Sequence, residues 1–265
     1  MLIYVGLRQY NYETLNLLLD DERINGVVLG DGFCNKRMFP HGDYDLLKYI
    51  EQADNRKKAI FYQTPCFLTD NKLNRQLQIL DFLKSCRNVW VLVQDLGMAY
   101  LIGRKYPELK LCWSRLGKFR VDILNADFIN SLSKLKVGYM EIEDENKVEK
   151  LVANGVIPCF MYGKVSYQSF GRICYSCYET DTPVSGCERI CLTKQYSIRD
   201  TQFLNEISLN GFVLGEKYSV SIEEKEKAVD MVKSNPSSEI LIGIYGKNLQ
   251  DVEYKIDSWK EMFRL

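Results

Sequence analysis

Short runs of apolar, β-branched and aromatic residues alternate along the chain with longer segments in which apolar residues recur at steps of three and four. The short runs predict strands and the longer segments predict amphipathic helices. Strands are expected at about 2–7, 26–30, 58–64, 89–94, 110–115, 137–143, 157–163 and 239–244. This alternation is typical of βα units on a parallel sheet. Eight such strands predict a (β/α)8 barrel.

The helical pattern is clearest in six segments of the chain. They are residues 43–56, 70–88, 121–135, 146–155, 221–235 and 249–263. Asp43 and Asp70 stand at the start of the first two, where an aspartate can cap the helix by accepting a hydrogen bond from the backbone. The polar faces of these helices are expected to be solvated.

The length of 265 residues fits one domain, because a single barrel of this kind commonly needs about 250 residues. We therefore expect one barrel domain over 1–265. The pattern fails only over residues 164–220, where cysteines and short β-like runs separated by turn residues replace the alternation. Long irregular insertions in compact domains are usually functional, so this excursion after the seventh strand is expected to carry chemistry.

Charge and hydropathy narrow the class of protein. Lysine plus arginine and aspartate plus glutamate balance at 35 each, which disfavours a protein that grips RNA or DNA mainly through phosphates. No apolar stretch approaches the roughly 18–20 residues of a membrane span. The first residues, MLIYVGLRQYNYETL, lack the pattern of a secretory signal, so a cytoplasmic location is expected. In such a reducing compartment, nine cysteines favour metal ligation over disulfides.

The cysteines are concentrated after the seventh predicted strand. Cys174, Cys177, Cys187 and Cys191 lie within eighteen residues, and Cys34 stands upstream in GDGFCNKR, just after the second strand. Loops that leave the carboxyl ends of barrel strands share one face, so Cys34 and the later cysteines are expected on the same face. Thiolates are strong ligands for iron–sulfur clusters and for zinc. A metal centre at this face is the first hypothesis.

Two other interpretations remain open for the cysteines. A C-x2-C pair followed nine residues later by a C-x3-C pair can hold a structural zinc ion with no help from Cys34. Alternatively, these cysteines are free thiols that pack as small apolar residues. Four further cysteines lie inside or at the edge of predicted strands or helices and are expected to be of that kind: Cys66, Cys86, Cys112 and Cys159.

Three segments resemble a known family. GDGFCNKR, the segment MYGKVSYQSFGRIC and the C-x12-C-x3-C spacing from Cys174 to Cys191 are similar to the collagenase-like peptidase family U-32. MEIEDENKVEKL also resembles the segment of that family's sixth strand. The resemblance implies a [4Fe-4S] cluster held by Cys34, Cys174, Cys187 and Cys191, with Cys177 as an extra thiol. Lys164 departs from the related sequences, which have histidine there.

The same resemblance implies a function. It is strongest to family members that assist ubiquinone biosynthesis, so it implies oxygen-independent hydroxylation of an aromatic, quinone-precursor-like substrate. Two related barrels would form the complex that performs it. The alternatives are a non-catalytic iron–sulfur partner subunit, hydroxylation of RNA bases, and the peptidase activity in the family's name. The balanced charge makes RNA the less favoured substrate.

Polar residues at the ends of predicted strands are the other candidates, because side chains there point toward a barrel's active site. They are Gln63, Gln94, Asp95, Ser114, Arg115, Glu141 and Glu143. Glu141 is the first choice as a catalytic residue because it also falls on the segment that resembles the family's sixth strand, and Arg115 is the second. The competing role for each is ordinary loop capping or hydrogen bonding.

Four further residues are candidates for substrate binding. Lys36 and Arg37 follow Cys34 and can neutralise an anionic cluster or bind a carboxylate or phosphate. Trp113 and Tyr162, together with Tyr167, can line an aromatic pocket. His41 is the only histidine. Because no serine or cysteine protease segment accompanies it, classical protease chemistry is not expected.

Overall fold

The computed structural model describes residues 2–7, 10–32, 39, 41–65, 70–114, 126–142, 148–162, 165–168, 196–199, 206–210, 213–217, 230, 240–246 and 248–263. The strands are β1 (Leu2–Leu7), β2 (Gly26–Leu29), β3 (Ala59–Gln63), β4 (Val89–Val93), β5 (Lys110–Trp113), β6 (Val137–Ile142), β7 (Ile157–Tyr162), β8 (Val165–Gln168), β9 (Tyr196–Arg199), β10 (Glu206–Asn210), β11 (Val213–Lys217) and β12 (Leu241–Gly246). The helices are α1 (Tyr12–Asp20), α3 (Asp43–Asn55), α4 (Asp70–Leu83), α5 (Leu96–Lys105), α6 (Ala126–Lys134), α7 (Val148–Ala153) and α10 (Leu249–Phe263).

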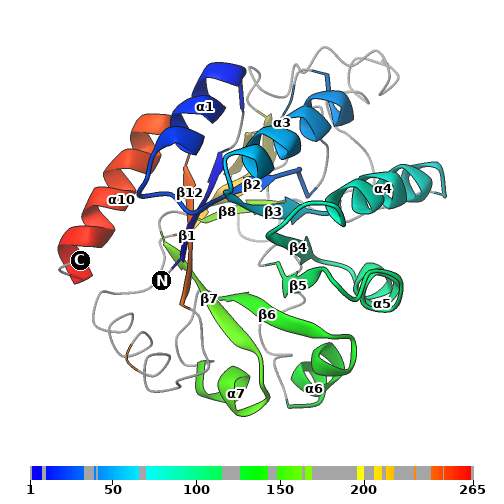
Figure 1. Cartoon of the computed structure of the whole chain (residues 1–265). Helices are drawn as coiled ribbons and strands as arrows, with labels where there is room; N and C mark the ends of the chain where they lie inside the picture. The colour runs from blue at the N-terminus through cyan, green and yellow to red at the C-terminus, as the bar shows by residue number, and fades with distance from the viewer. Residues whose placement is uncertain are drawn as a thin grey trace. The chain divides into compact units, whose positions relative to one another are not determined.

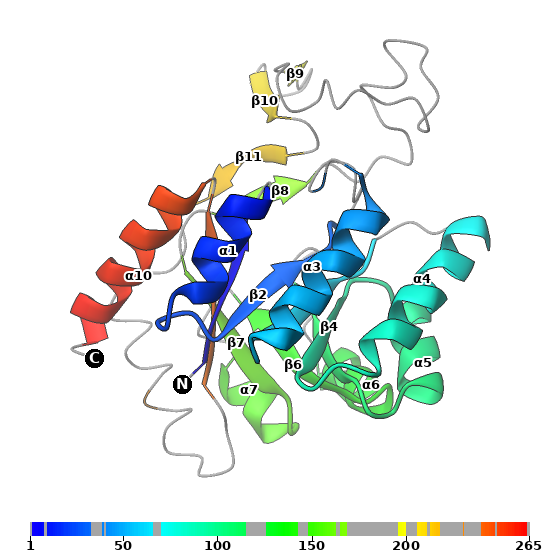
Figure 2. The ribbon, with the colours of Figure 1, turned by 45° about the horizontal axis from the view of Figure 1, so that its top comes forward.

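Eight strands form a closed parallel barrel in the order β1-β12-β7-β6-β5-β4-β3-β2. The last strand closes the ring against the first, in register from Leu2 opposite Leu241 to Leu7 opposite Gly246. Helices lie outside the strands, and α10 lies beside α1 (Figures 1 and 2). The expected (β/α)8 fold is therefore confirmed, and each of the eight predicted strands corresponds to a barrel strand.

The chain forms two compact units. The barrel belongs to the unit made of Met1–Gly163 and Ser219–Leu265, and the second unit is Lys164–Tyr218. Within the second unit, β8, β11, β10 and β9 form a four-stranded antiparallel sheet. The excursion expected over 164–220 thus contains regular β structure between its turn residues.

Strand alternation divides the barrel core into two layers. Residues such as Val5, Val91 and Ile242 pack with helix residues into the layer between strands and helices. The alternate residues pack into a separate cluster inside the ring. Its members are Tyr4, Val28, Ala59, Phe61, Trp90, Leu92, Cys112, Cys159 and Leu241. Because successive side chains on a strand point to opposite faces, this cluster fills the barrel.

Stacked rings fill much of the barrel interior. The ring centroids of Tyr4 and Phe61 lie 3.9 Å apart, and those of Phe61 and Trp90 lie 4.9 Å apart. In both pairs the ring planes are nearly parallel. Gly26 makes room for this stack, because a Cβ there would come within 3.0 Å of the Phe61 ring. The stack fixes the position of Tyr4, whose hydroxyl reaches the functional site.

Two helix starts illustrate how local sequence sets the boundaries. Asn11 caps α1, and its side-chain oxygen accepts a hydrogen bond from the Thr14 N–H at 2.7 Å. The expected cap of α3 by Asp43 is wrong. Gly42 is the N-cap, with φ of 59° and no side-chain cap bond, and Asp43 lies in the first turn. Asp45 instead accepts the His41 backbone N–H at 2.8 Å.

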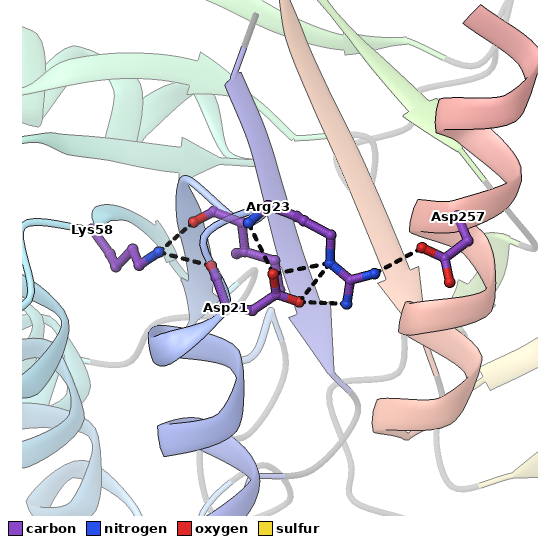
Figure 3. A network of polar contacts seen from close by, with 5 residues as sticks. Asp21, Arg23, Lys58 and Asp257 are labelled. Carbon is purple, nitrogen blue, oxygen red and sulfur yellow. Dashed lines mark hydrogen bonds and ion pairs between the residues drawn. The ribbon is translucent and has the colours of Figure 1, made fainter. Parts of the chain in front are cut away.

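A charged clamp ties the turn after α1 to α10 (Figure 3). The Arg23 guanidinium donates to the Asp21 carboxylate at 2.7 Å and to Asp257 of α10 at 2.7 Å. Lys58, just before β3, donates to the backbone oxygens of Asp21 and Ile24 at 2.9 and 2.6 Å. These contacts join the segment before β2 to the segment before β3 and to α10, which follows the last barrel strand.

The clamp predicts acid sensitivity that depends on Asp21. Partial burial raises the pKa of Asp21, but the hydrogen bonds and charge of Arg23 outweigh burial, so the pKa is lowered. A lowered folded-state pKa adds stability above the unfolded value of about 3.9, and that stability is lost as the pH falls through the folded value. The free energy of unfolding is measured by urea unfolding at a series of pH values. Below about pH 4 it should fall less steeply in Asp21→Asn than in the wild type, and the difference should be less than roughly 1 kcal/mol because the pair is partly exposed. If the free energy of unfolding falls with pH equally in the wild type and in Asp21→Asn, the Asp21 carboxylate does not contribute to acid sensitivity.

Candidate functional site

Five side chains from five strands meet inside the barrel near its carboxyl end. We call them the polar centre: Tyr4, Gln63, Ser114, Glu141 and Tyr245. Gln63 ends β3, Ser114 directly follows β5, and Glu141 and Tyr245 stand next to last in β6 and β12. Gln63, Ser114 and Glu141 are at most 5% exposed. Deeper in the barrel the inward positions hold apolar residues. At the carboxyl end, where barrel enzymes have their active sites, the inward positions hold polar residues.

Glu141 is the hub of the polar centre. Its Oε1 accepts hydrogen bonds from the Tyr4 hydroxyl at 2.9 Å and the Tyr245 hydroxyl at 3.0 Å. Its Oε2 lies 3.2 Å from the Ser114 Oγ, within hydrogen-bond distance. A buried carboxylate is tolerated only when hydrogen-bonded or paired. The two tyrosine hydroxyls therefore hold the Glu141 side chain in one position, while the single Ser114 hydroxyl hydrogen can bond either Glu141 Oε2 or Gln63 Oε1.

Gln63 is held in one orientation by the strand ends. Its Nε2 donates to the backbone oxygens of Leu92 and Thr64 at 3.2 and 3.3 Å. Turning the amide over would place its oxygen against these two carbonyl oxygens, so Oε1 must face the Ser114 hydroxyl, 3.0 Å away. Because Gln63 and Ser114 are fixed before any ligand arrives, the site is preorganised.

The phenol and thiol groups of the barrel interior are held in their neutral forms. Burial, and then the charge of Glu141, raises the pKa of Tyr4 well above its ordinary value, so its hydroxyl remains a donor. Burial, and then the neighbouring Cys159, raises the pKa of Cys112. The two sulfurs lie 3.8 Å apart, and both cysteines are free and buried. Burial without a counter-charge keeps the Cys112 thiol neutral and unreactive, as expected for a core cysteine.

Several candidate residues lie elsewhere in the barrel unit. Trp113 points away from Ser114, into the layer beneath α6, where its ring contacts Phe128 edge-on at 5.6 Å between centroids. Because neighbouring strand residues face opposite sides, Trp113 and Ser114 cannot both face the barrel interior, and the expected role of Trp113 in an aromatic pocket with Tyr162 and Tyr167 stays a prediction. Asp95 is exposed and caps α5 through the Met98 N–H at 2.8 Å.

The remaining candidates are Tyr162 and His41, which lie on described backbone, and a larger set that lies outside the described residues. Tyr162 is the last residue of β7, opposite Ile244. His41 is exposed at the turn before α3. Outside the described residues lie Cys34, Lys36, Arg37, Cys66, Arg115, Glu143, Lys164, Cys174, Cys177, Cys187 and Cys191. Within the described residues no cluster of three or more histidine, cysteine, aspartate or glutamate side chains can hold a metal ion.

Tyr4 and Tyr245 belong to the site but are not among the residues expected from the sequence. Both occupy inward positions of their strands, two residues from inward glycines, Gly6 and Gly243. A glycine two residues from a tyrosine on the same strand is the sequence signal that could have identified these two residues. A barrel interior has room for a long side chain only where its neighbour is small.

Fold and polar centre together define a (β/α)8 barrel protein with a buried acidic site at the carboxyl end of its strands. The family model of peptidase family U32 matches residues 10–218, and the chain belongs to that family. Among the described residues, no helix has the length and apolar character needed to cross a membrane.

Several solved structures are similar to this chain at low sequence identity, and the U32 peptidase among them has the same fold. The U32 peptidase Mk0906 is 12% identical over 94% of both chains, with a TM-score of 0.53. A chitinase from Chromobacterium violaceum is 11% identical over 97% of this chain and 98% of its own, with a TM-score of 0.45. A GH10 endoxylanase from a sugarcane soil metagenome is 11% identical over 65% of this chain and 70% of its own, with a TM-score of 0.40. Among curated protein sequences there is no match.

Proposed function

We propose that this protein is an iron–sulfur component of an oxygen-independent hydroxylation system that acts on an aromatic, quinone-precursor-like substrate. The observation behind this proposal is the cysteine pattern of a chain in family U32: Cys34 after β2, and the C-x12-C-x3-C spacing from Cys174 to Cys191. This pattern resembles UbiV, a ubiquinone-biosynthesis accessory protein of the same family. The [4Fe-4S] cluster would be held by Cys34, Cys174, Cys187 and Cys191.

The donor set fits such a cluster chemically. Four thiolates are the usual ligands of a [4Fe-4S] cluster, and they serve zinc equally well. Lys36 and Arg37, next to Cys34 in the chain, supply positive charge that would balance an anionic cluster or hold a substrate carboxylate. When bound, a cluster of this kind supplies one-electron transfer.

The polar centre gives the protein's own residues a role in addition to that of the cluster. Oxygen-independent hydroxylation replaces a ring C–H by C–OH, so it takes the oxygen atom and the oxidising equivalents from an oxygen-atom donor supplied as a co-substrate, and it releases the ring proton. Glu141, which two tyrosine hydroxyls hold in place, would accept that proton. Arg115, directly after Ser114 in the chain, is proposed as the second catalytic residue, and Tyr162, at the end of β7, as a substrate contact. The partner is proposed to be a second barrel of the same family, in a cytoplasmic complex.

The metal is the first part of the proposal to test. Protein purified without oxygen should be brown and contain about four irons and about four sulfides per chain. Iron, acid-labile sulfide and zinc are measured on the same sample. One zinc per chain in a colourless protein would show that the cluster assignment is wrong.

The activity requires a separate assay. The iron-loaded protein, alone and with a co-encoded family relative, is given an aromatic substrate and an oxygen-atom donor without O2, and hydroxylated product is measured by mass spectrometry. Product only with both proteins supports a two-barrel system. Product that is unchanged when this chain's cluster is absent supports a non-catalytic role for the cluster. Hydroxylated bases in added RNA, with no small-molecule product, would favour an RNA substrate.

Peptidase activity is the second candidate, and the family match is the observation that favours it. It predicts cleavage of denatured collagen by the purified protein without any partner. Cleavage that disappears in Glu141→Gln would assign the polar centre to peptide hydrolysis and would overturn the hydroxylation proposal.

A further inference from the structure

Gln94 is a buried amide next to the polar centre, and one of its two polar ends has no partner among the residues that the structure describes. It directly follows β4, and by strand alternation it takes the inward position after Trp90 and Leu92. Its side chain is 6% exposed. β4 lies in the ring between β3 and β5, so Gln94 stands between the strands that supply Gln63 and Ser114.

Two backbone carbonyls fix the orientation of the Gln94 amide. Nε2 donates to Gly32 O at 2.8 Å and to Thr64 O at 2.7 Å. A flipped amide would set its oxygen against both carbonyl oxygens and lose both bonds. Gly30 holds this edge in place, because its φ of +93° turns the chain after β2 and a Cβ there would lie 2.6 Å from Gln63 O. Nε2 is therefore committed to the protein, and Oε1 points away from these two carbonyls.

Gln94 Oε1 has no hydrogen-bond donor among the described residues, and it is shielded from solvent. Buried polar atoms are nearly always bonded, so an orphaned acceptor at a carboxyl-end site calls for a functional explanation. Side chains of the barrel interior fill the space below it, beginning with Leu92. The carboxyl end of the barrel is where ligands of this fold bind, so a ligand donor would approach Oε1 from that side, and the groups that shield Oε1 from solvent would have to move aside.

We infer that Gln94 Oε1 is a specificity-determining acceptor for a hydroxyl or amino group on the ligand bound at the carboxyl end of the barrel. That the group sits on an aromatic ring rests on the proposed function. An amide oxygen held this way accepts but never donates, so it distinguishes a phenol from its methyl ether. Sites built to bond a hydroxyl reject an analogue that lacks it, because their own polar group is then left unpaired.

The test compares phenol with anisole, its methyl ether, as probes for the full-length protein. Ligand-observed NMR titration should give phenol an affinity about three- to tenfold higher than anisole, the factor that one neutral hydrogen bond contributes. Gln94→Met keeps the length of the side chain and removes the oxygen, so phenol should fall to the level of anisole while anisole is unchanged. A phenol preference that survives in Gln94→Met, or the absence of binding by either probe, would overturn the inference.

A measurement on the unaltered protein covers the case in which Gln94→Met does not fold, since that variant also leaves the carbonyls of Gly32 and Thr64 without their donor. The side-chain carbonyl carbon resonance of Gln94 should shift on addition of phenol and stay in place with anisole. Equal responses to both probes would also overturn the inference. Neither readout requires turnover or a cluster, so failure of the proposed hydroxylation activity is seen separately.

Discussion

Cys34→Ser is expected to abolish the proposed iron–sulfur centre, lowering iron and sulfide from the expected level of about four each per chain to background. Serine is a poor replacement because its hydroxyl is harder and far less acidic than a thiol, so it does not supply the anionic sulfur that such a cluster requires. The measurement is iron and sulfide per folded chain after anaerobic purification, with circular dichroism to show that the barrel is intact. Cys174→Ser, Cys187→Ser and Cys191→Ser should behave alike.

Cys177→Ser is the matched control for this prediction. Cys177 stands three residues after Cys174, inside the same cysteine segment, but it is an extra thiol in the proposed ligand set. The Cys177→Ser protein should therefore keep its iron and sulfide. A structural zinc site made from the four local cysteines predicts the reverse, with Cys177→Ser losing metal and Cys34→Ser unaffected. Metal content in the two folded variants therefore distinguishes the iron–sulfur hypothesis from the zinc hypothesis.

The sequence predicts the strands of the barrel well because each is a short, strongly apolar run with its own turn signals. The eighth, expected at 239–244, is Leu241–Gly246 in the structure. Helices α1 and α5 are missing from the sequence prediction. The sequence YETLNLLLD has a run of three leucines that blurs the helical period, so α1 is evident only from its Asn11 cap.

The candidate site was predictable in part, for reasons that the strands explain. Glu141, Gln63 and Ser114 follow from their positions at strand ends, since the period of two aims all three inward. The same rule turns Trp113 away from the barrel interior once Ser114 is inward, because adjacent residues cannot share a face. The contribution of Tyr4 and Tyr245 depends on closure of the ring, where β1 pairs with β12 and β12 with β7. Pairing between the first and last strands is a long-range property that local sequence does not encode.

Ring closure also explains why Tyr4 can reach Glu141. In the strand register Tyr4 lies opposite Gly243, and Gly243 lies opposite Met161. The Tyr4 hydroxyl extends past Gly243 to within 3.6 Å of the Met161 sulfur and 2.9 Å of Glu141. Gly243 is therefore the gap through which a residue of β1 enters the polar centre.

Gly243→Ala is expected to destabilise the protein by about 2–3 kcal/mol, the usual cost of overpacking a filled core. The added Cβ would lie 2.7 Å from the Tyr4 hydroxyl oxygen and 2.8 Å from the Met161 sulfur. Tyr4 cannot yield easily, because its ring is stacked on Phe61 and its hydroxyl is bonded to Glu141. Thermal unfolding should show a melting temperature lower by roughly 5–10 °C.

Gly138→Ala, on β6, is the matched control for Gly243→Ala. A Cβ at Gly138 meets nothing within 4 Å, and this glycine is not among those with positive φ. It should be neutral or stabilising by up to about 1 kcal/mol, because alanine restricts the unfolded chain. If Gly243→Ala instead melts with the wild type, Tyr4 must be able to move aside, and the hydroxyl bond to Glu141 would not be a fixed part of the polar centre. A large loss in Gly243→Ala alone would show that the packing around Tyr4 holds Glu141 in place.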